Sequence, residues 1–292
     1  MKKIVIPSLI LLSILFSAFT LFNTYDPAYV KTTKIKNNNV WYTMIDMNRD
    51  GSGKRIKIKY FSSRDVKTGE SVSKRFNDWR QGRNIICYSS GAYMIQNGSY
   101  YTPEGFNVDN GALVNGVLET NRFDGLVIVY ATGGMVATNL KDGDLTLGDF
   151  PNRKFDLRNR PIDKTTFQNW CEKNGATVFQ THLLTYKDEI KMGGNSSQQV
   201  AKRRFLAVGK VNGEVHHTIV QFDLNVTLFE ATKMVNDFLK SNKNMEIIYM
   251  INLDTGMQDV FGHYTPQGTA DPRIVGGTQL DNAANLLVYY YE

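Results

Sequence analysis

The residues best suited to chemistry stand together where an apolar run ends. Residues 246–251, E-I-I-Y-M-I, are rich in β-branched side chains and predict a buried strand. Asn252, Asp254 and Gly256 follow directly, so an amide, a carboxylate and a turn glycine stand at the strand end. Polar groups in this position are held rigidly and can face a cleft. The alternative is a plain turn in which Asp254 accepts hydrogen bonds from nearby backbone amides.

Three amphipathic segments are each predicted to form a helix that leads through a short turn into a strand. In the last of them, Leu228, Ala231 and Val235 share one face, and Thr227 and Glu230 form a capping box. In the second, Asp163 is expected to cap the helix. The predicted helices span residues 71–79, 163–173 and 227–239, and the strands that follow them span 84–88, 176–181 and 246–251.

Further strands are predicted along most of the chain. Alternating or continuous apolar runs mark them at residues 40–47, 55–61, 125–131, 204–209, 217–222 and 285–291. Because strands outnumber helices, we expect an α+β fold: a strand-rich mixed sheet that is backed by a few helices and built from recurring helix–turn–strand units.

The N-terminus indicates export. Lys2 and Lys3 precede an apolar run from Ile4 to Phe22, a pattern typical of a secretory signal peptide. The run is also long enough for an uncleaved membrane anchor. We therefore expect a signal peptide or N-terminal anchor at 1–22, a flexible lead-in at 23–39 and a single domain at 40–292. In either case the domain works outside the cytoplasm, in the periplasm or the extracellular space.

Composition and motifs argue against several classes of partner. The net charge is +6 with the two signs interspersed, so nucleic acid is not an expected partner. No glycine-rich phosphate loop opens a helix, which argues against a nucleotide cofactor. His216 and His217 are adjacent on a predicted strand and point to opposite faces, and we predict no metal site and no cofactor. Cys87 and Cys171 are expected to be buried thiols, although export permits a disulfide.

Several segments resemble, in order, motifs of the phosphodiester glycosidase domain family, which includes the lysosomal "uncovering enzyme". The segments are Cys87–Tyr93 (C-Y-S-S-G-A-Y), Phe179–Leu184 (F-Q-T-H-L-L), Arg203–Gly209 (R-R-F-L-A-V-G), Ile251–Gly256 (I-N-L-D-T-G), Arg273-Ile-Val and Asn282–Val288. The resemblance implies that residues 40–292 form one phosphodiester glycosidase-like domain. It also implies hydrolysis of a sugar-1-phosphodiester at the glycosidic bond.

The resemblance assigns roles to individual residues. It implies that Asp254 is the catalytic carboxylate, that Asn252 positions it and that His182 supplies a proton or a hydrogen bond. Arg204, or failing it Arg203, would hold the phosphate through a guanidinium fork. The groups expected to line the substrate cleft are Ser89, Ser90, Tyr93 and Gly256. The alternatives are non-catalytic. The two arginines would then be solvent-exposed residues at the start of a strand, and His182 would have a structural role.

The chain departs from the family pattern at several places. His182 stands where the family has Gly-Pro, and the arginine segment at Arg203 and Arg204 is one residue longer. Ser89 stands where the family carries asparagine, and T-G-M-Q-D at residues 255–259 replaces a glycine-rich run. Two functions therefore stay open. The first is an exported glycosidase that acts on sugar-phosphate or glycan substrates. The second is a non-catalytic relative that keeps the fold and binds a glycan or a protein. A membrane contact is expected only through an uncleaved N-terminal segment.

Overall fold

The computed structural model describes residues 26–37, 39–51, 55–65, 67–98, 100–193, 198–256, 259–270 and 280–291. The predicted signal peptide or anchor lies outside these residues, as do Met257, Gln258 and the Arg273-Ile-Val motif. Among the described residues, no helix is long and apolar enough to span a membrane.

The largest sheet has seven antiparallel strands and carries the chemistry-bearing strand at residues 246–253. Its order is β1 (Val30–Asn37), β2 (Val40–Asn48), β18 (Glu214–Phe222), β17 (Arg204–Val211), β20 (Glu246–Leu253), β14 (Leu183–Tyr186) and β15 (Glu189–Ile190). Helix α4 (Leu228–Lys243) packs on one face through Leu228, Ala231 and Val235. It begins at the predicted capping box, since Thr227 Oγ1 accepts a hydrogen bond from the Glu230 amide at 3.2 Å.

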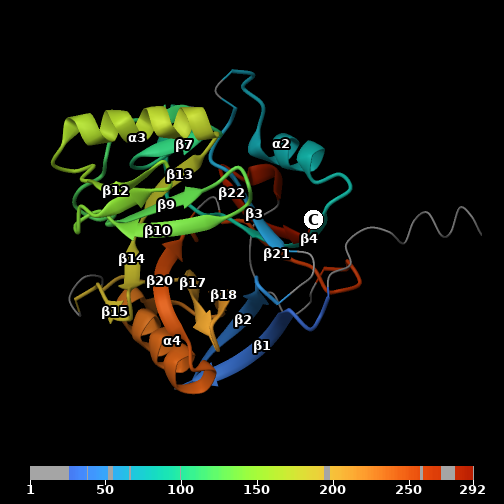
Figure 1. Cartoon of the computed structure of the whole chain (residues 1–292). Coiled ribbons are helices and arrows are strands. Elements are labelled where there is room, and N and C mark those ends of the chain that lie inside the picture. The colour runs from blue at the N-terminus through green and yellow to red at the C-terminus, as the bar shows by residue number, and fades with distance from the viewer. Residues whose placement is uncertain are drawn as a thin grey trace, which may run out of the picture.

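A second sheet of five strands lies beside the first (Figure 1). Its order is β10 (Met135–Asn139), β9 (Gly125–Val129), β13 (Thr177–Thr181), β7 (Asn107–Asp109) and β8 (Ala112–Asn115). Helix α3 (Pro161–Asn174) covers it, and the hairpin β11 (Leu145–Leu147)–β12 (Phe150–Phe155) adjoins it. The predicted cap was wrong. Arg160 is the N-cap and Pro161 opens the helix, while Asp163 in the first turn pairs with Arg153 at 2.6 Å.

A third sheet of four strands completes the main layers. Its order is β21 (Phe261–His263), β4 (Asn84–Ser89), β22 (Leu286–Tyr291) and β3 (Ile56–Phe61), and α2 (Val72–Trp79) packs against it. The smaller elements are the hairpin β5 (Met94–Asn97)–β6 (Tyr100–Pro103), the pair β16 (Val200–Ala201)–β19 (Val226–Thr227) and the 3-10 turn η1 (Leu280–Asn282).

The three sheets share one apolar core. Ile45 and Leu206 enter it from the seven-stranded sheet, Val127 and Phe179 from the five-stranded sheet, and Leu287 from the four-stranded sheet. All five side chains are buried. Each helix lies on its own sheet at the periphery (Figure 1), so the helices back the sheets as expected.

One segment joins two of the sheets. The chain runs along β13 in the five-stranded sheet, bends at His182 and continues as β14 in the seven-stranded sheet. Gly125 pairs with Thr181 on one side of the bend, and a Cβ atom there would lie 3.0 Å from the Thr181 carbonyl oxygen. The backbone of Asn252 donates to the His182 carbonyl at 3.1 Å, which fixes the bend against the end of β20.

The structure confirms an α+β, strand-rich chain and corrects finer points of the prediction. The pairings between the named strands are antiparallel and divide among several sheets, so the expected single mixed sheet is wrong. Strands β4, β13 and β20 each follow a helix as predicted, yet they lie in three different sheets. The lead-in at 23–39 is also wrong over Val30–Asn37, which forms edge strand β1. Backbone pairing with β2 holds this strand although its side chains are mostly polar.

Candidate functional site

Asp254 follows β20 and lies at the end of the buried strand, as the sequence indicated. Its backbone N–H donates to the Gly91 carbonyl at 3.0 Å, and its Oδ1 accepts from the Gly256 amide at 2.9 Å. The side chain therefore makes the local turn that was the alternative interpretation. It also lines a cavity, so a turn and a site are compatible at this residue.

The cavity has a volume of about 270 Å³ and draws its walls from three parts of the chain. The β5–β6 hairpin supplies one wall, the segment before β17 supplies another, and the turn after β20 supplies the third. The lining residues are Tyr93, Met94, Tyr101, Gln199, Ala201, Arg203, Asp254, Thr255 and Gly256. Four of the predicted site residues thus meet in one space.

Burial dominates the electrostatics of Asp254. Only 6% of the residue is exposed, and desolvation raises the pKa of its carboxyl to about 6. The negative charge of Asp259 raises the pKa further, while the Gly256 hydrogen bond and the Arg204 charge oppose the rise. Asp254 therefore exchanges its proton close to neutral pH.

Arg203 is the arginine that lines the cavity. Its Nη2 donates to the Gln199 carbonyl at 2.6 Å, and its Nε donates to the Val226 carbonyl at 3.3 Å. A guanidinium has five N–H donors, so these two hydrogen bonds leave capacity for a ligand. Burial lowers the pKa of Arg203, but its normal pKa is so high that it stays charged.

Arg204 points elsewhere and is completely buried. Its Nη1 forms an ion pair with Asp259 at 2.7 Å, and its Nε donates to Gln221 Oε1 at 2.7 Å. The guanidinium carbon also lies 4.2 Å from the ring centroid of Phe261. Neighbouring residues of an extended chain face opposite sides, so only one arginine can reach the cavity. The sequence-based expectation named Arg204 first and Arg203 second as the residue that reaches the cleft. The positions of the two side chains favour Arg203 instead.

Ser89 and Ser90 are also buried, and neither lines the cavity. Ser89 Oγ donates to the Ser90 carbonyl at 2.6 Å and accepts from Arg204 Nη1 at 3.3 Å. Ser90 Oγ accepts from the Val260 amide at 2.9 Å. The Ser90 hydroxyl thus ties the end of β4 to the segment before β21, and the Ser89 hydroxyl ties it to Arg204.

Asn252, Tyr93 and His182 form a small polar cluster beside Asp254. The Nδ2 of Asn252 donates to the Tyr93 hydroxyl, and its buried Oδ1 has no hydrogen-bond partner among the described residues. The His182 ring lies edge-on to Tyr93 and Phe123, with centroid distances of 5.3 and 5.0 Å. Burial lowers the pKa of His182 to about 4, so the ring is neutral at neutral pH and is a poor proton donor.

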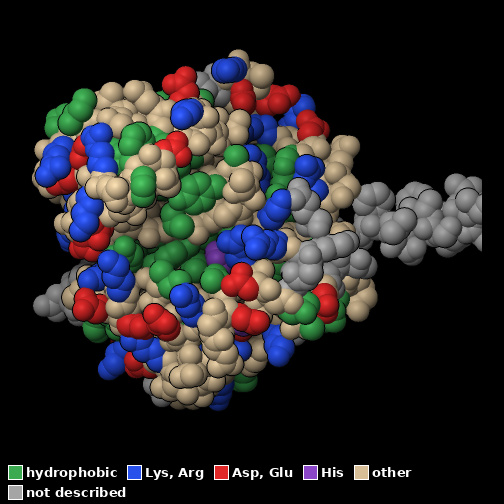
Figure 2. Space-filling model, viewed as in Figure 1, with side chains coloured by type: hydrophobic (Ala, Val, Ile, Leu, Met, Phe, Trp, Pro, Cys, Tyr) green, Lys and Arg blue, Asp and Glu red, His purple; other side chains and the backbone are tan. Residues whose placement is uncertain are grey.

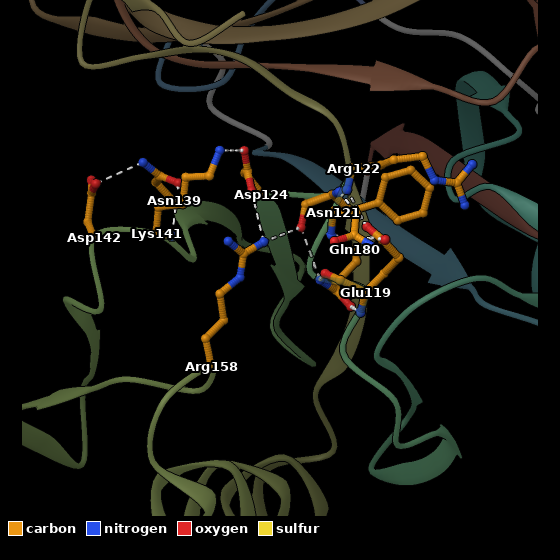
Figure 3. Close-up of polar contacts among 10 residues, drawn as sticks. Glu119, Asn121, Arg122, Asp124, Asn139, Lys141, Asp142, Arg158 and Gln180 are labelled. Atoms are coloured by element: carbon orange, nitrogen blue, oxygen red, sulfur yellow. Dashed lines mark hydrogen bonds and ion pairs between the residues drawn. The ribbon is translucent and has the colours of Figure 1, made fainter. Parts of the chain in front are cut away.

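The segment from Glu119 to Phe123 packs against His182 through Phe123. A network of hydrogen bonds around Gln180 holds this segment (Figure 3). Gln180 Oε1 accepts from the backbone amides of Phe106 at 2.6 Å and Glu119 at 2.9 Å. Its Nε2 donates to the carbonyls of Glu119 and Phe123. Arg158 joins the same network through the Phe123 carbonyl. Phe123, and with it the packing of His182, is thereby fixed.

Two contributors to the site were missed from the sequence. Tyr101 reaches the cavity from a hairpin that no apolar pattern marked. Asn285 stood in a motif of the resemblance but received no role. Its Oδ1 accepts from the amides of Gly91 at 2.6 Å and Ala92 at 3.1 Å, which holds the turn that leads into Tyr93.

Cys87 and Cys171 are buried free thiols, as expected. They belong to different apolar clusters. Among the described residues, no group of three or more histidine, cysteine, aspartate or glutamate side chains is placed to hold a metal ion.

Comparison with known proteins finds only low similarity to solved structures. No family model and no curated protein matches it. A "hypothetical protein from Synechocystis" shares 10% identity at a TM-score of 0.48, covering 90% of this chain and 62% of that protein. A "Putative exported protein" from Burkholderia pseudomallei K96243 shares 10% identity at a TM-score of 0.43, covering 86% of this chain and 74% of its own. This chain thus spans less than two thirds of the first protein.

Proposed function

We propose that this protein is an exported hydrolase that cleaves sugar-1-phosphodiesters in envelope or extracellular glycans. The observation that carries the proposal is that Asp254 and Arg203 line the same cavity, together with Tyr93 and Tyr101. A carboxyl, a guanidinium and hydroxyl-bearing rings are the groups that this reaction requires. The resemblance of the strand-end motifs to the phosphodiester glycosidase domain family supports the same reaction.

In the proposed reaction Arg203 binds the phosphate and Asp254 acts on water. Water adds to the anomeric carbon while the bond from that carbon to the phosphate oxygen breaks. The Asp254 carboxylate takes the proton from water and returns it to solvent. The products are a free sugar and a phosphomonoester. Because a phosphate is a good leaving group, no strong general acid is required, and a neutral His182 is compatible with the reaction.

A second function is a non-catalytic relative that binds a glycan or a protein. Three observations favour it. Ser89 and His182 do not line the cavity. Its volume of about 270 Å³ lies just below the usual range of ligand sites, which begins at about 300 Å³. Thr255 also stands where the family has glycine, with its hydroxyl donating to the Lys202 carbonyl at 2.7 Å.

The test is release of free sugar from methyl phosphodiesters of N-acetylglucosamine and glucose by the purified domain. We expect Asp254→Asn to lower kcat by roughly 10²-fold to 10⁴-fold, because it removes the base. Arg203→Gln should mainly raise KM, and Lys202→Gln, an exposed neighbour, should change neither constant. Sugar release that survives Asp254→Asn contradicts the assigned role. Binding of these esters without release, in the wild type, would favour the non-catalytic function.

A further inference from the structure

A second cavity lies on another part of the molecule, where residues of β3, α2, β7 and β8 and of the segment before α2 come together. Its volume is about 550 Å³, within the range of small-molecule sites. It shares no lining residue with the cavity at Asp254. Its walls are Lys59, Phe61, Asp65, Lys67, Glu70, Arg75, Asp78, Trp79, Asp109, Asn110 and Ala112.

Asp109 gives this cavity an unused buried acceptor. The residue is 5% exposed, and its Oδ2 accepts from Arg75 Nη1 at 2.7 Å. Its Oδ1 is buried and has no hydrogen-bond partner among the described residues. An unsatisfied buried carboxylate oxygen is costly, and a ligand hydroxyl or N–H would remove that cost.

Lys59 places a donor in the same cavity. Its ammonium lies 5.8 Å from the ring centroid of Phe61, and within the described parts of the chain it forms no ion pair. Burial lowers the pKa of Lys59, and the nearby Asp109 charge counteracts this. The side chain therefore presents a partly desolvated donor within reach of the same ligand as Asp109.

The charges of the walls limit the class of ligand. Four lining side chains are acidic (Asp65, Glu70, Asp78 and Asp109) and three are basic (Lys59, Lys67 and Arg75). This balance disfavours phosphate and other anions. A ligand must instead donate to Asp109 and accept from Lys59, which hydroxyl groups do at once. Phe61 and Trp79 add an apolar wall of the kind that covers the carbon faces of a ring.

We propose that this cavity binds a neutral saccharide unit, with Asp109 accepting from one hydroxyl and Lys59 donating to another. The proposal does not depend on hydrolysis at Asp254. It gives the protein a second glycan contact, separate from the first cavity.

The test is a titration of the purified domain with glucose, galactose, N-acetylglucosamine and cellobiose. Ligand-observed NMR and calorimetry measure the binding. We expect at least one of these sugars to bind. Lys59→Met, which keeps the apolar stem, should weaken that binding roughly tenfold, as should Asp109→Asn. The matched control Lys154→Met replaces an exposed strand lysine outside both cavities and should leave binding unchanged. Thermal unfolding of each variant shows whether it is folded.

Three outcomes would overturn the proposal. One is the absence of binding by every sugar at millimolar concentration. Another is sugar binding that Arg203→Gln abolishes while Lys59→Met leaves it intact, since that binding would belong to the first cavity. The third is tighter binding of inorganic phosphate or glycine than of any sugar, with loss in Lys59→Met, because the ligand would then be charged. Loss of sugar binding in Lys59→Met with an unchanged melting temperature supports it.

Discussion

At the residue scale, Asp254 combines a structural and a chemical role. One carboxylate oxygen closes the turn to Gly256, while the residue lines the cavity shared with Arg203. Burial raises the pKa of Asp254 to about 6. In the buried ion pair nearby, the charge of Asp259 raises this pKa further and the charge of Arg204 lowers it. The residue thus holds a carboxyl whose protonation changes near neutral pH, next to a cation that stays charged.

This pKa predicts how Asp254→Asn changes stability with pH. The folded-state pKa of about 6 lies above the ordinary aspartate value of 3.8, so the folded protein binds this proton more tightly than the unfolded chain does. The wild type therefore keeps this contribution below about pH 4 and loses it as the pH rises through about 6. Asparagine cannot ionise. We expect the free energy of unfolding of the variant to gain about 3 kcal/mol over that of the wild type as the pH rises from about 4 to above about 6.

Urea unfolding of both proteins across this pH range measures the effect. Asp237→Asn is the matched control, because Asp237 is exposed on α4. A stability difference between Asp254→Asn and the wild type that does not change with pH would show that the carboxyl titrates in the folded protein as it does in the unfolded chain.

At the element scale, the site depends on the segment that bends at His182 between β13 and β14. Gln180 sits just before the bend and is fully buried. It forms four hydrogen bonds to backbone groups of the chain around Phe106, Glu119 and Phe123. Together with Glu119 and Arg158, this side chain holds a loop without regular structure beside His182.

Gln180→Leu should destabilise the protein by about 3 kcal/mol, because it leaves buried backbone groups without partners. Hydrogen exchange should accelerate most at the amides of Phe106 and Glu119, which lose their acceptor. Gln96→Leu is the matched control, since Gln96 is exposed and its side chain donates to the Gly98 carbonyl at the surface. Equal exchange rates in Gln180→Leu and the wild type would show that other contacts hold the loop.

At the scale of the whole molecule, three sheets meet around one apolar core, and an ion pair joins two of them. Arg204 belongs to β17 of the seven-stranded sheet, while Asp259 directly precedes Val260 and β21 of the four-stranded sheet. Ser89 at the end of β4 contacts the same guanidinium. This buried ion pair is therefore a junction between two sheets, next in sequence to Arg203 of the first cavity.

Removing one partner of the Arg204–Asp259 ion pair should lower the stability of the protein. We expect Arg204→Met to destabilise the protein by about 3–5 kcal/mol, because it leaves Asp259 with an uncompensated charge near the interior. Adding Asp259→Asn to Arg204→Met should recover part of the loss, giving a coupling energy on the order of 1–3 kcal/mol. Guanidinium unfolding of the wild type, both single variants and the double variant measures the cycle. Strictly additive effects would show that the two side chains do not stabilise each other.

Local patterns in the sequence predicted many of the helices and strands. The β-branched run at 246–251 and the capping box at Thr227 predicted β20 and α4, because strand burial and helix capping depend on neighbouring residues. Burial of both cysteines and the position of Asp254 at a strand end were predicted for the same reason.

Only the tertiary structure decided which side chains share a space. Arg203 and Arg204 are chemically alike in the sequence, and the contact of β17 with neighbouring strands turned one toward the cavity and the other toward Asp259. Edge strand β1 has little apolar signal, since its hydrogen bonds come from β2. Tyr101 and Asn285 act through partners distant in the chain, and such contacts leave no periodic pattern in the sequence around them.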